Sequence, residues 1–154
     1  YSSTNYDMTI KEFEATWHHV AIAVQDMEGM VDFLTRNFGF TVAWDHEHRS
    51  GAMMDAVVGL KDVDAHIVML EGFGVQIELF HYWNPQGQNA MPERQCDFGI
   101  THFCLSVKQI HKAYQDLCKK GVTFNCPPQS LREGVWVTYL KGPEGLTIEL
   151  MEYE

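Results

Sequence analysis

The feature that most constrains this chain is an internal repeat, in which its two halves follow the same order of short sequence patterns. The first copy opens with His19-Val-Ala-Ile-Ala-Val24 and the second with His102-Phe-Cys-Leu-Ser-Val107. The copies also close alike, with Val75-Gln-Ile-Glu-Leu79 in the first and Leu146-Thr-Ile-Glu-Leu150 in the second. Matched openings and closings indicate two copies of one structural unit.

Each copy has the pattern of one strand, one helix and three further strands. Alternating Val20, Ile22 and Val24 are typical of a strand, and helical spacing follows in both copies. The helices are expected to end at Gly39 and Gly121, because glycine is a common stop signal. The later strands are expected at residues 41–45, 66–70, 75–82, 123–126, 135–140 and 147–153. The repeat unit is therefore βαβββ, and the predicted fold class is α+β.

The 154 residues, of which 45% are hydrophobic, are enough for one domain with its own core. Residues 1–16 are expected to form a loose N-terminal lead-in with a short helical turn around Ile10 to Phe13. The single domain is expected to span residues 17–154. Its parts are module one at about 17–83, a polar linker with two prolines at 84–97, and module two at about 98–154.

The net charge of −10 argues against the clustered basic surface that nucleic acids and anionic membranes require. The sequence has no apolar run of membrane-spanning length and no signal-peptide pattern at its start. A cytoplasmic protein that acts on a small molecule is therefore expected.

Four side chains are candidates for metal ligands, namely His19, Glu78, His102 and Glu149. Strand alternation places Val20, Ile22 and Val24 on one face, so His19 must point to the other. The same argument places the other three candidates opposite their apolar neighbours. All four therefore lie on faces with small or polar neighbours, and a half-barrel lined in this way would enclose a cavity.

Imidazole and carboxylate ligands together suit a borderline divalent ion such as zinc, nickel, cobalt, iron or manganese. A single histidine or glutamate in these positions is commonplace, but here each residue type recurs at the same place in both copies. The sequence therefore predicts one divalent ion held by four protein ligands. Such a site leaves up to two octahedral positions open for a substrate, as a site of catalysis requires.

The chain resembles the vicinal oxygen chelate superfamily, which includes glyoxalase I, methylmalonyl-CoA epimerase, extradiol dioxygenases and the bleomycin and fosfomycin resistance proteins. The resemblance covers residues 17–153 and is strongest at residues 18–26, 76–79, 101–107 and 142–150. It implies a cupped mixed sheet, or half-barrel, with helices on the outer face. It also implies metal ligands at His19, Glu78, His102 and Glu149. His18 is a rival to His19, but alternation places it on the Val20 side.

In this superfamily the two units complete the cup either within one chain or by swapping between chains, and a homodimer is expected here. Two carboxylate ligands resemble the bacterial form of glyoxalase I and favour a lyase or isomerase. Glu149 or Glu78 would then remove a proton next to a carbonyl group whose oxygen the metal holds. Substrate-binding residues are less clear, although Arg49, Arg94 and Arg132 are candidates for holding a carboxylate.

Two alternatives remain open. The segment from Tyr139 to Glu149 matches the spacing of the second half of the extradiol dioxygenase signature, which makes an iron(II)-dependent dioxygenase one alternative. The histidine that the first half of this signature requires is missing from residues 129–138. Tyr139 is interpreted as a core residue. The other alternative is a metal-free protein that sequesters its ligand. The complete set of four candidate ligands favours an enzyme over such a binding protein.

Overall fold

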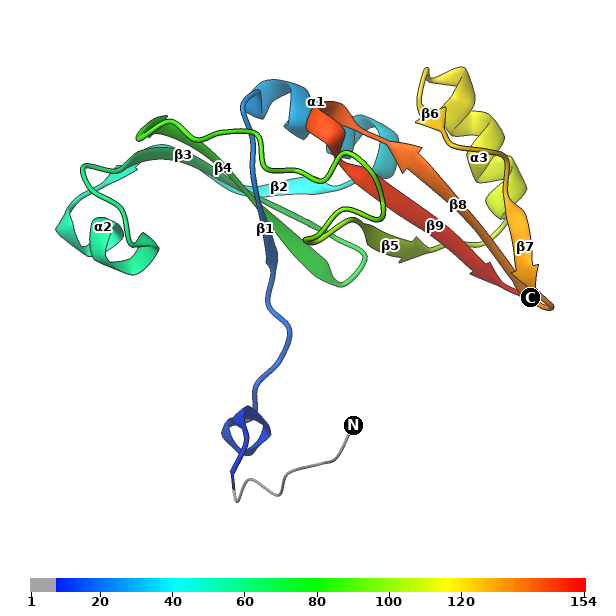
Figure 1. Ribbon diagram of the computed structural model, residues 1–154, viewed down its shortest axis with the longest axis horizontal. Coiled ribbons are helices and arrows are strands. Elements are labelled where there is room, and N and C mark those ends of the chain that lie inside the picture. The colour runs from blue at the N-terminus through cyan, green and yellow to red at the C-terminus, as the bar shows by residue number, and fades with distance from the viewer. Residues whose placement is uncertain (1–7) are drawn as a thin grey trace.

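Two mixed β-sheets, one from each repeat, make up the body of the protein in a computed structural model that describes residues 8–154 (Figure 1). The sheet of module one has the order β1-β4-β3-β2, and β1 runs parallel to β4. Its elements are β1 (Val20–Ala23), α1 (Met27–Phe38), β2 (Thr41–Ser50), α2 (Ala52–Val58), β3 (Asp64–Gly72) and β4 (Val75–Asn84).

Module two repeats this topology. Its sheet has the order β5-β9-β8-β6, with β7 also paired to β8, and β5 runs parallel to β9. Its elements are β5 (Phe103–Ser106), α3 (Ile110–Lys119), β6 (Thr123–Phe124), β7 (Gln129–Arg132), β8 (Val135–Lys141), the 3-10 helix η2 (Pro143–Gly145) and β9 (Thr147–Tyr153). The predicted α+β fold with two βαβββ modules is confirmed, with two separate sheets in place of one continuous sheet.

The repeat extends to the register of the strands. Ala21 lies opposite Glu78 in the β1–β4 pair, and Cys104 lies opposite Glu149 in the β5–β9 pair. In each module, the glutamate therefore lies opposite the residue that comes two positions after the histidine, and this histidine directly precedes the opening strand. The two modules thus hold their His and Glu candidates in equivalent places.

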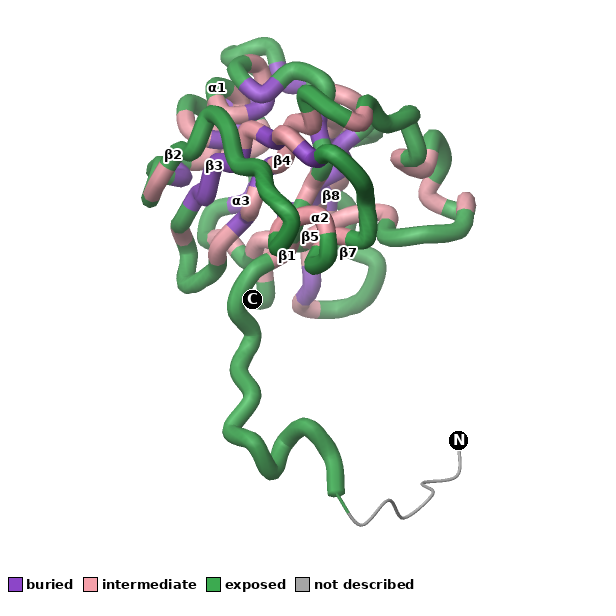
Figure 2. Tube along the Cα trace, turned by 90° about the vertical axis from the view of Figure 1, so that its left-hand side faces the viewer, coloured by how far each residue is buried: buried purple, intermediate pink, exposed green. Residues whose placement is uncertain are grey.

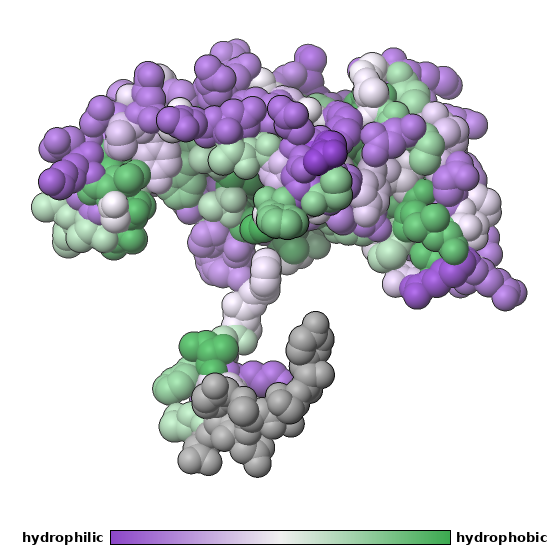
Figure 3. Space-filling model, in the orientation of Figure 1, coloured by the Kyte–Doolittle hydropathy of each residue, from purple (hydrophilic) through white to green (hydrophobic). Residues whose placement is uncertain are grey.

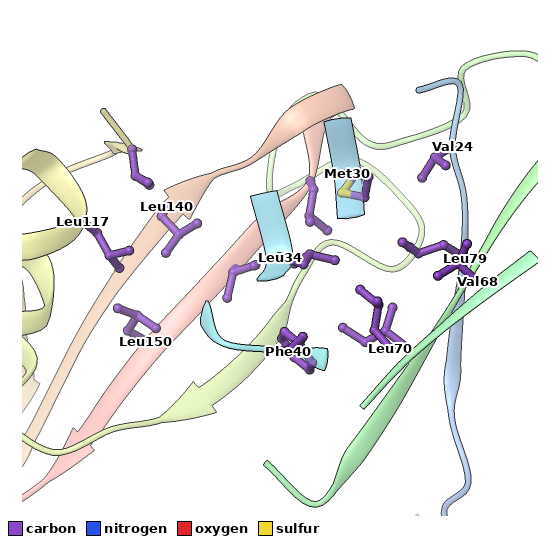
Figure 4. Packing of buried hydrophobic residues seen from close by; sticks show 14 of the residues in the cluster. Val24, Met30, Leu34, Phe40, Val68, Leu70, Leu79, Leu117, Leu140 and Leu150 are labelled. Atoms are coloured by element: carbon purple, nitrogen blue, oxygen red, sulfur yellow. The ribbon is translucent and has the colours of Figure 1, made fainter. Parts of the chain in front are cut away.

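One hydrophobic core joins the two modules. The α1 helix buries Met27, Met30 and Leu34, and α3 buries Ile110 and Leu117 against the same cluster. Figure 4 shows side chains from both modules in this cluster, including Leu70 and Leu79 from the first and Leu140 and Leu150 from the second. Shared apolar burial of this kind holds the modules together without a common sheet.

A second, smaller cluster covers the opposite face of the first sheet. Val63, Ala65 and Ile67 are buried there, and Met54 and Val58 of α2 pack against them. The α2 helix was not expected from the sequence, since seven residues are too few to show a helical period. The strand β7 was also missed, because all four of its residues are exposed and it has no apolar face.

The N-terminal arm leaves the body as an exposed segment (Figures 1 and 2). Its 3-10 helix η1 (Ile10–Phe13) agrees with the expected turn, and Thr9 and Glu12 form a capping box at its start. Ile10 and Phe13 are exposed, and Figure 3 shows hydrophobic residues of the arm standing apart from the body. Residues 1–7 of the expected lead-in lie outside the described residues. No helix within residues 8–154 is long and apolar enough to cross a membrane.

Two glutamates from other elements accept hydrogen bonds from backbone N–H groups at the starts of α1 and α3. Glu144 of η2 accepts hydrogen bonds from the Gln25 and Asp26 N–H groups at 2.6 and 3.0 Å, and so ties module two to the start of α1. Glu152 of β9 accepts bonds from the Gln109 and Ile110 N–H groups at 2.8 and 3.0 Å at the start of α3. A carboxylate at a helix N-terminus is stabilised by these donors and by the helix dipole.

Glu152→Gln should make the stability of the protein less dependent on pH in the acid range. Folding lowers the pKa of Glu152 below its ordinary value of 4.5, because its carboxylate accepts the bonds from the Ile110 and Gln109 backbone. Such a group stabilises the fold above its unfolded-state pKa, and this contribution is lost as pH falls through the folded-state pKa. The urea midpoints of wild type and variant should therefore differ near neutral pH and converge as pH falls through the lowered pKa of Glu152.

Glu133→Gln, in the exposed turn between β7 and β8, controls for the general loss of one negative charge. A difference between wild type and Glu152→Gln that stays constant down to acid pH would contradict the capping role of Glu152.

Candidate metal site

Module one brings His19 and Glu78 together. His19 stands immediately before β1, and its Nε2 atom lies 3.6 Å from Oε1 of Glu78 in the middle of β4. The two side chains are 36% and 17% exposed, so the pair is half-buried but open to a ligand. The parallel pairing of β1 with β4 creates this contact, because it fixes Glu78 beside Ala21.

Module two brings His102 and Glu149 together in the same way. The Nε2 atom of His102 lies 3.1 Å from Oε1 of Glu149, and the side chains are 27% and 16% exposed. His102 stands immediately before β5, and Glu149 lies on β9, the neighbouring parallel strand. We call these two pairs the His19–Glu78 half-site and the His102–Glu149 half-site.

The separations within the half-sites fit shared coordination of one ion. Two ligand atoms about 2.1 Å from one metal ion lie about 3.0 Å apart at a right angle and about 3.4 Å apart at a tetrahedral angle. The observed N–O distances of 3.1 and 3.6 Å are close to this range. Each half-site can therefore supply one nitrogen and one carboxylate oxygen to a divalent ion.

The four candidate ligands do not form one group within a single chain. Among residues 8–154, no three His, Cys, Asp or Glu side chains lie close enough to hold a metal ion together. Each half-site is instead next to the edge of its sheet, since β1 and β5 are the outermost strands on one side. A cavity of about 1030 Å³ runs along β1 and is lined by His102 and by residues 86–92 of the segment that follows β4.

Polar groups surround the His102–Glu149 half-site. Tyr139 of β8 lies opposite Glu149 in the sheet, and its hydroxyl is 3.3 Å from Nε2 of His102. Burial raises the pKa of the Tyr139 phenol, and the charge of Glu149 raises it further. Burial and Glu149 together raise the pKa of the Cys104 thiol to about 11. Tyr139 therefore stays a neutral hydrogen-bond donor, and Cys104 stays a thiol at neutral pH.

The His19–Glu78 half-site is less polar. Met69, which lies opposite Glu78 in the sheet, takes the place that Tyr139 has in module two, and it is buried. Burial raises the pKa of the nearby Tyr82, and the charge of Glu78 adds to the shift. His18 is not beside Glu78 but has its Nδ1 atom 2.7 Å from Nδ1 of His19. The two half-sites thus share their ligand types but differ in what surrounds them.

Sequence reasoning missed two residues of the site. Tyr139 was interpreted as core, but strand alternation would have found it, since it shares a face with Glu149 across the β8–β9 pair. Gln95, whose Oε1 lies 3.0 Å from Nδ1 of His102, has no signal in the sequence, because it lies in an irregular segment. Arg94, a candidate for holding a substrate, is instead paired with Asp97 at 2.9 Å.

Paired βαβββ modules with a His–Glu pair at the same place in each define a class of protein built on one duplicated structural unit. A family profile described as the glyoxalase/bleomycin resistance protein/dioxygenase superfamily matches residues 16–150. The chain therefore belongs to this superfamily, as the sequence motifs predicted.

Relatives of known activity include two epimerases. The chain is 30% identical over 145 residues to a 2-epi-5-epi-valiolone epimerase from Actinomyces sp., covering 87% of this chain and 77% of that protein. It is 29% identical over 138 residues to the mitochondrial methylmalonyl-CoA epimerase of Dictyostelium discoideum, covering 88% and 76%. Similarity to glyoxalase I of Saccharomyces cerevisiae is 27% over 150 residues, covering 88% of this chain and 44% of that enzyme.

Solved structures share the fold. A glyoxalase family protein from Bacillus cereus superposes with a TM-score of 0.76 at 20% identity, covering 88% of this chain and 92% of that one. A genomically encoded fosfomycin resistance protein from Listeria monocytogenes superposes with a TM-score of 0.64 at 13% identity, covering 91% and 94%. At these identities the likeness concerns the fold alone.

Proposed function

We propose that this protein is a divalent-metal-dependent isomerase or lyase that moves a proton on the carbon next to a substrate carbonyl group. The observation that carries the proposal is the His–Glu pair that recurs in the same register in both modules, at N–O distances of 3.6 and 3.1 Å. Duplicated N and O ligands suit zinc, nickel, cobalt, iron or manganese. The substrate class follows from the epimerases and glyoxalase I among the relatives.

The complete site requires two copies of the chain in this proposal. The half-sites do not meet within residues 8–154 of one chain, and each is next to an outermost strand, β1 or β5. A two-fold dimer that sets β1 of one copy beside β5 of the other would bring His19 and Glu78 to the partner copy's His102 and Glu149. Since a two-fold contact occurs twice, one homodimer would hold two complete sites.

A bound divalent ion would supply Lewis acidity toward the oxygen of the substrate carbonyl. Glu149 is the proposed base: its carboxylate takes the proton from the carbon next to the carbonyl group and returns it to the same carbon or to its neighbour. Tyr139, held as a neutral phenol by burial and by Glu149, donates a hydrogen bond where negative charge develops on oxygen. Glu78 is the second candidate base.

Proton transfer of this kind should proceed without oxygen and with zinc as the only metal. The test is to incubate the zinc-loaded protein anaerobically in deuterated water with α-hydroxy ketones, hemithioacetals and acyl-CoA esters. The expected result is entry of deuterium at the carbon next to the carbonyl group of one of these classes, because redox chemistry is not needed. His102→Ala, which removes a ligand, is the matched negative control.

One observation favours a second function, an iron(II)-dependent extradiol-type dioxygenase. Tyr139 lies beside His102 and Glu149, within the segment that matches the second half of the dioxygenase signature. In that case the protein should purify with iron and consume oxygen with catechol-like compounds, and zinc loading should abolish activity. Oxygen uptake by the iron-loaded protein, without deuterium exchange in the zinc-loaded protein, would replace the isomerase proposal by this one.

A further inference from the structure

We infer that Gln95 is a positioning residue that fixes the tautomer of His102, so that Nε2 presents a free lone pair to a metal ion. The inference rests on the proposed metal site and concerns how one of its ligands is prepared. Oε1 of Gln95 lies 3.0 Å from Nδ1 of His102, on the side of the ring away from Glu149. An amide oxygen only accepts hydrogen bonds, so Nδ1 must carry the proton and donate it.

The other end of the Gln95 amide is held as well. Its Nε2 group donates to Oγ1 of Thr147 at 3.2 Å, and Thr147 is 1% exposed. The ammonium group of Lys141 donates to the same Thr147 oxygen, also at 3.2 Å. With its amide nitrogen bound to Thr147, Gln95 directs its amide oxygen toward His102.

The backbone around Gln95 is fixed by a local turn. The Arg94 N–H donates to the Asp97 carboxylate at 2.9 Å, and the Asp97 N–H donates to the Arg94 carbonyl oxygen at 3.0 Å. The Arg94 guanidinium also binds this carboxylate and holds the pKa of Asp97 below its ordinary value. Gln95 therefore projects from a closed turn, although it belongs to an irregular segment.

On the opposite side of the imidazole ring, the Glu149 carboxylate lies 3.1 Å from Nε2 of His102 and, because it only accepts hydrogen bonds, competes with Gln95 for the ring proton until a metal ion lies between them. The Tyr139 hydroxyl lies 3.3 Å from Nε2 of His102 and can donate a hydrogen bond to it. Thr101 Oγ1 also lies 2.9 Å from Nδ1, but a hydroxyl can donate or accept and does not select a tautomer. Gln95 is thus the neighbour that favours a proton on Nδ1, and a metal ion bound by Glu149 would leave this tautomer without a competitor. Groups that bind the second nitrogen of a ligand histidine are known to fix its tautomer and orientation.

The His19–Glu78 half-site has no such arrangement in the described residues. Nδ1 of His19 faces Nδ1 of His18 at 2.7 Å, and an imidazole nitrogen can be a donor or an acceptor. This difference predicts that His102 is better prepared than His19 to offer its Nε2 lone pair to a metal ion.

The test combines nitrogen-15 NMR of the histidine rings in the metal-free protein with zinc titration of the same samples. Gln95→Met should shift His102 toward the tautomer protonated at Nε2 and weaken zinc binding about 10- to 100-fold, as removal of such a partner usually does. Gln95→Glu, which still accepts at the same place, should keep the wild-type tautomer and bind zinc at least as tightly. Gln129→Met, in the exposed strand β7, is the control for an unrelated glutamine.

The outcomes separate this inference from the proposed function. If wild type binds no zinc tightly, the metal site itself is wrong, whatever the tautomer of His102. If wild type binds zinc but Gln95→Met keeps both the tautomer and the affinity within about two-fold, Gln95 is not a positioning residue. Should Gln95→Met fail to fold, Thr147→Val removes the acceptor for the Gln95 amide with little change of shape and should alter the tautomer in the same direction. An unchanged tautomer in Thr147→Val would then overturn the inference.

Discussion

A mixture of His19→Ala and His102→Ala chains should regain tight metal sites that neither variant has alone. In the proposed dimer, each site takes module one from one copy and module two from the other. A heterodimer of the two variants then holds one intact site and one site without either histidine. Random pairing makes half of the dimers heterodimers, so about a quarter of the wild-type number of sites should return. Cobalt titration of the co-expressed variants, counted per chain, measures this number.

The matched control pairs His19→Ala with Glu78→Ala, which leaves no oxygen ligand at position 78. Both changes lie in module one, so every site in such a heterodimer has an altered first module, and no tight sites should return. Sedimentation of the wild type at micromolar concentration should give a dimer. A wild type that binds one ion per chain, combined with no recovery in the His19→Ala and His102→Ala mixture, would mean that all four ligands meet within one chain.

Glu149→Gln should abolish deuterium exchange far more than it weakens metal binding. An amide can still offer an oxygen to a metal ion but cannot take a proton from carbon, and loss of a general base typically costs about 10²- to 10⁴-fold. The exchange rate next to the substrate carbonyl and the zinc affinity are measured on the same preparation. The ratio of the two effects distinguishes a base from a residue that serves only as a ligand.

Two further variants calibrate this result. Glu152 lies on β9 like Glu149, but its carboxylate binds the start of α3. The Glu152→Gln variant should therefore leave the exchange rate near that of wild type. Glu78→Gln should weaken zinc binding with a smaller effect on exchange. If Glu78→Gln instead removes exchange while Glu149→Gln keeps it, the base is Glu78, in the less polar half-site beside Met69.

Much of the fold could be predicted from the sequence because the repeat shows each unit twice. The strands at His66–Leu70 and Thr147–Tyr153 have enough alternating apolar residues to be recognised, and they lie within β3 and match β9. The α1 helix ends before Gly39, as predicted, because glycine adopts the left-handed conformation that closes the helix at low cost. Where burial was weak or the element short, as in α2 and β7, the sequence had no pattern to detect.

The sequence by itself determined which residue types recur at the two half-sites, because strand alternation and duplication depend only on local order. It therefore identified His19, Glu78, His102 and Glu149 as candidates, although not how they combine. Only the tertiary structure decided that the four candidate ligands form two separate pairs, since this depends on how the modules share one core. It also placed Tyr139 and Gln95 beside His102, because contacts across a sheet and from an irregular turn depend on packing between distant segments.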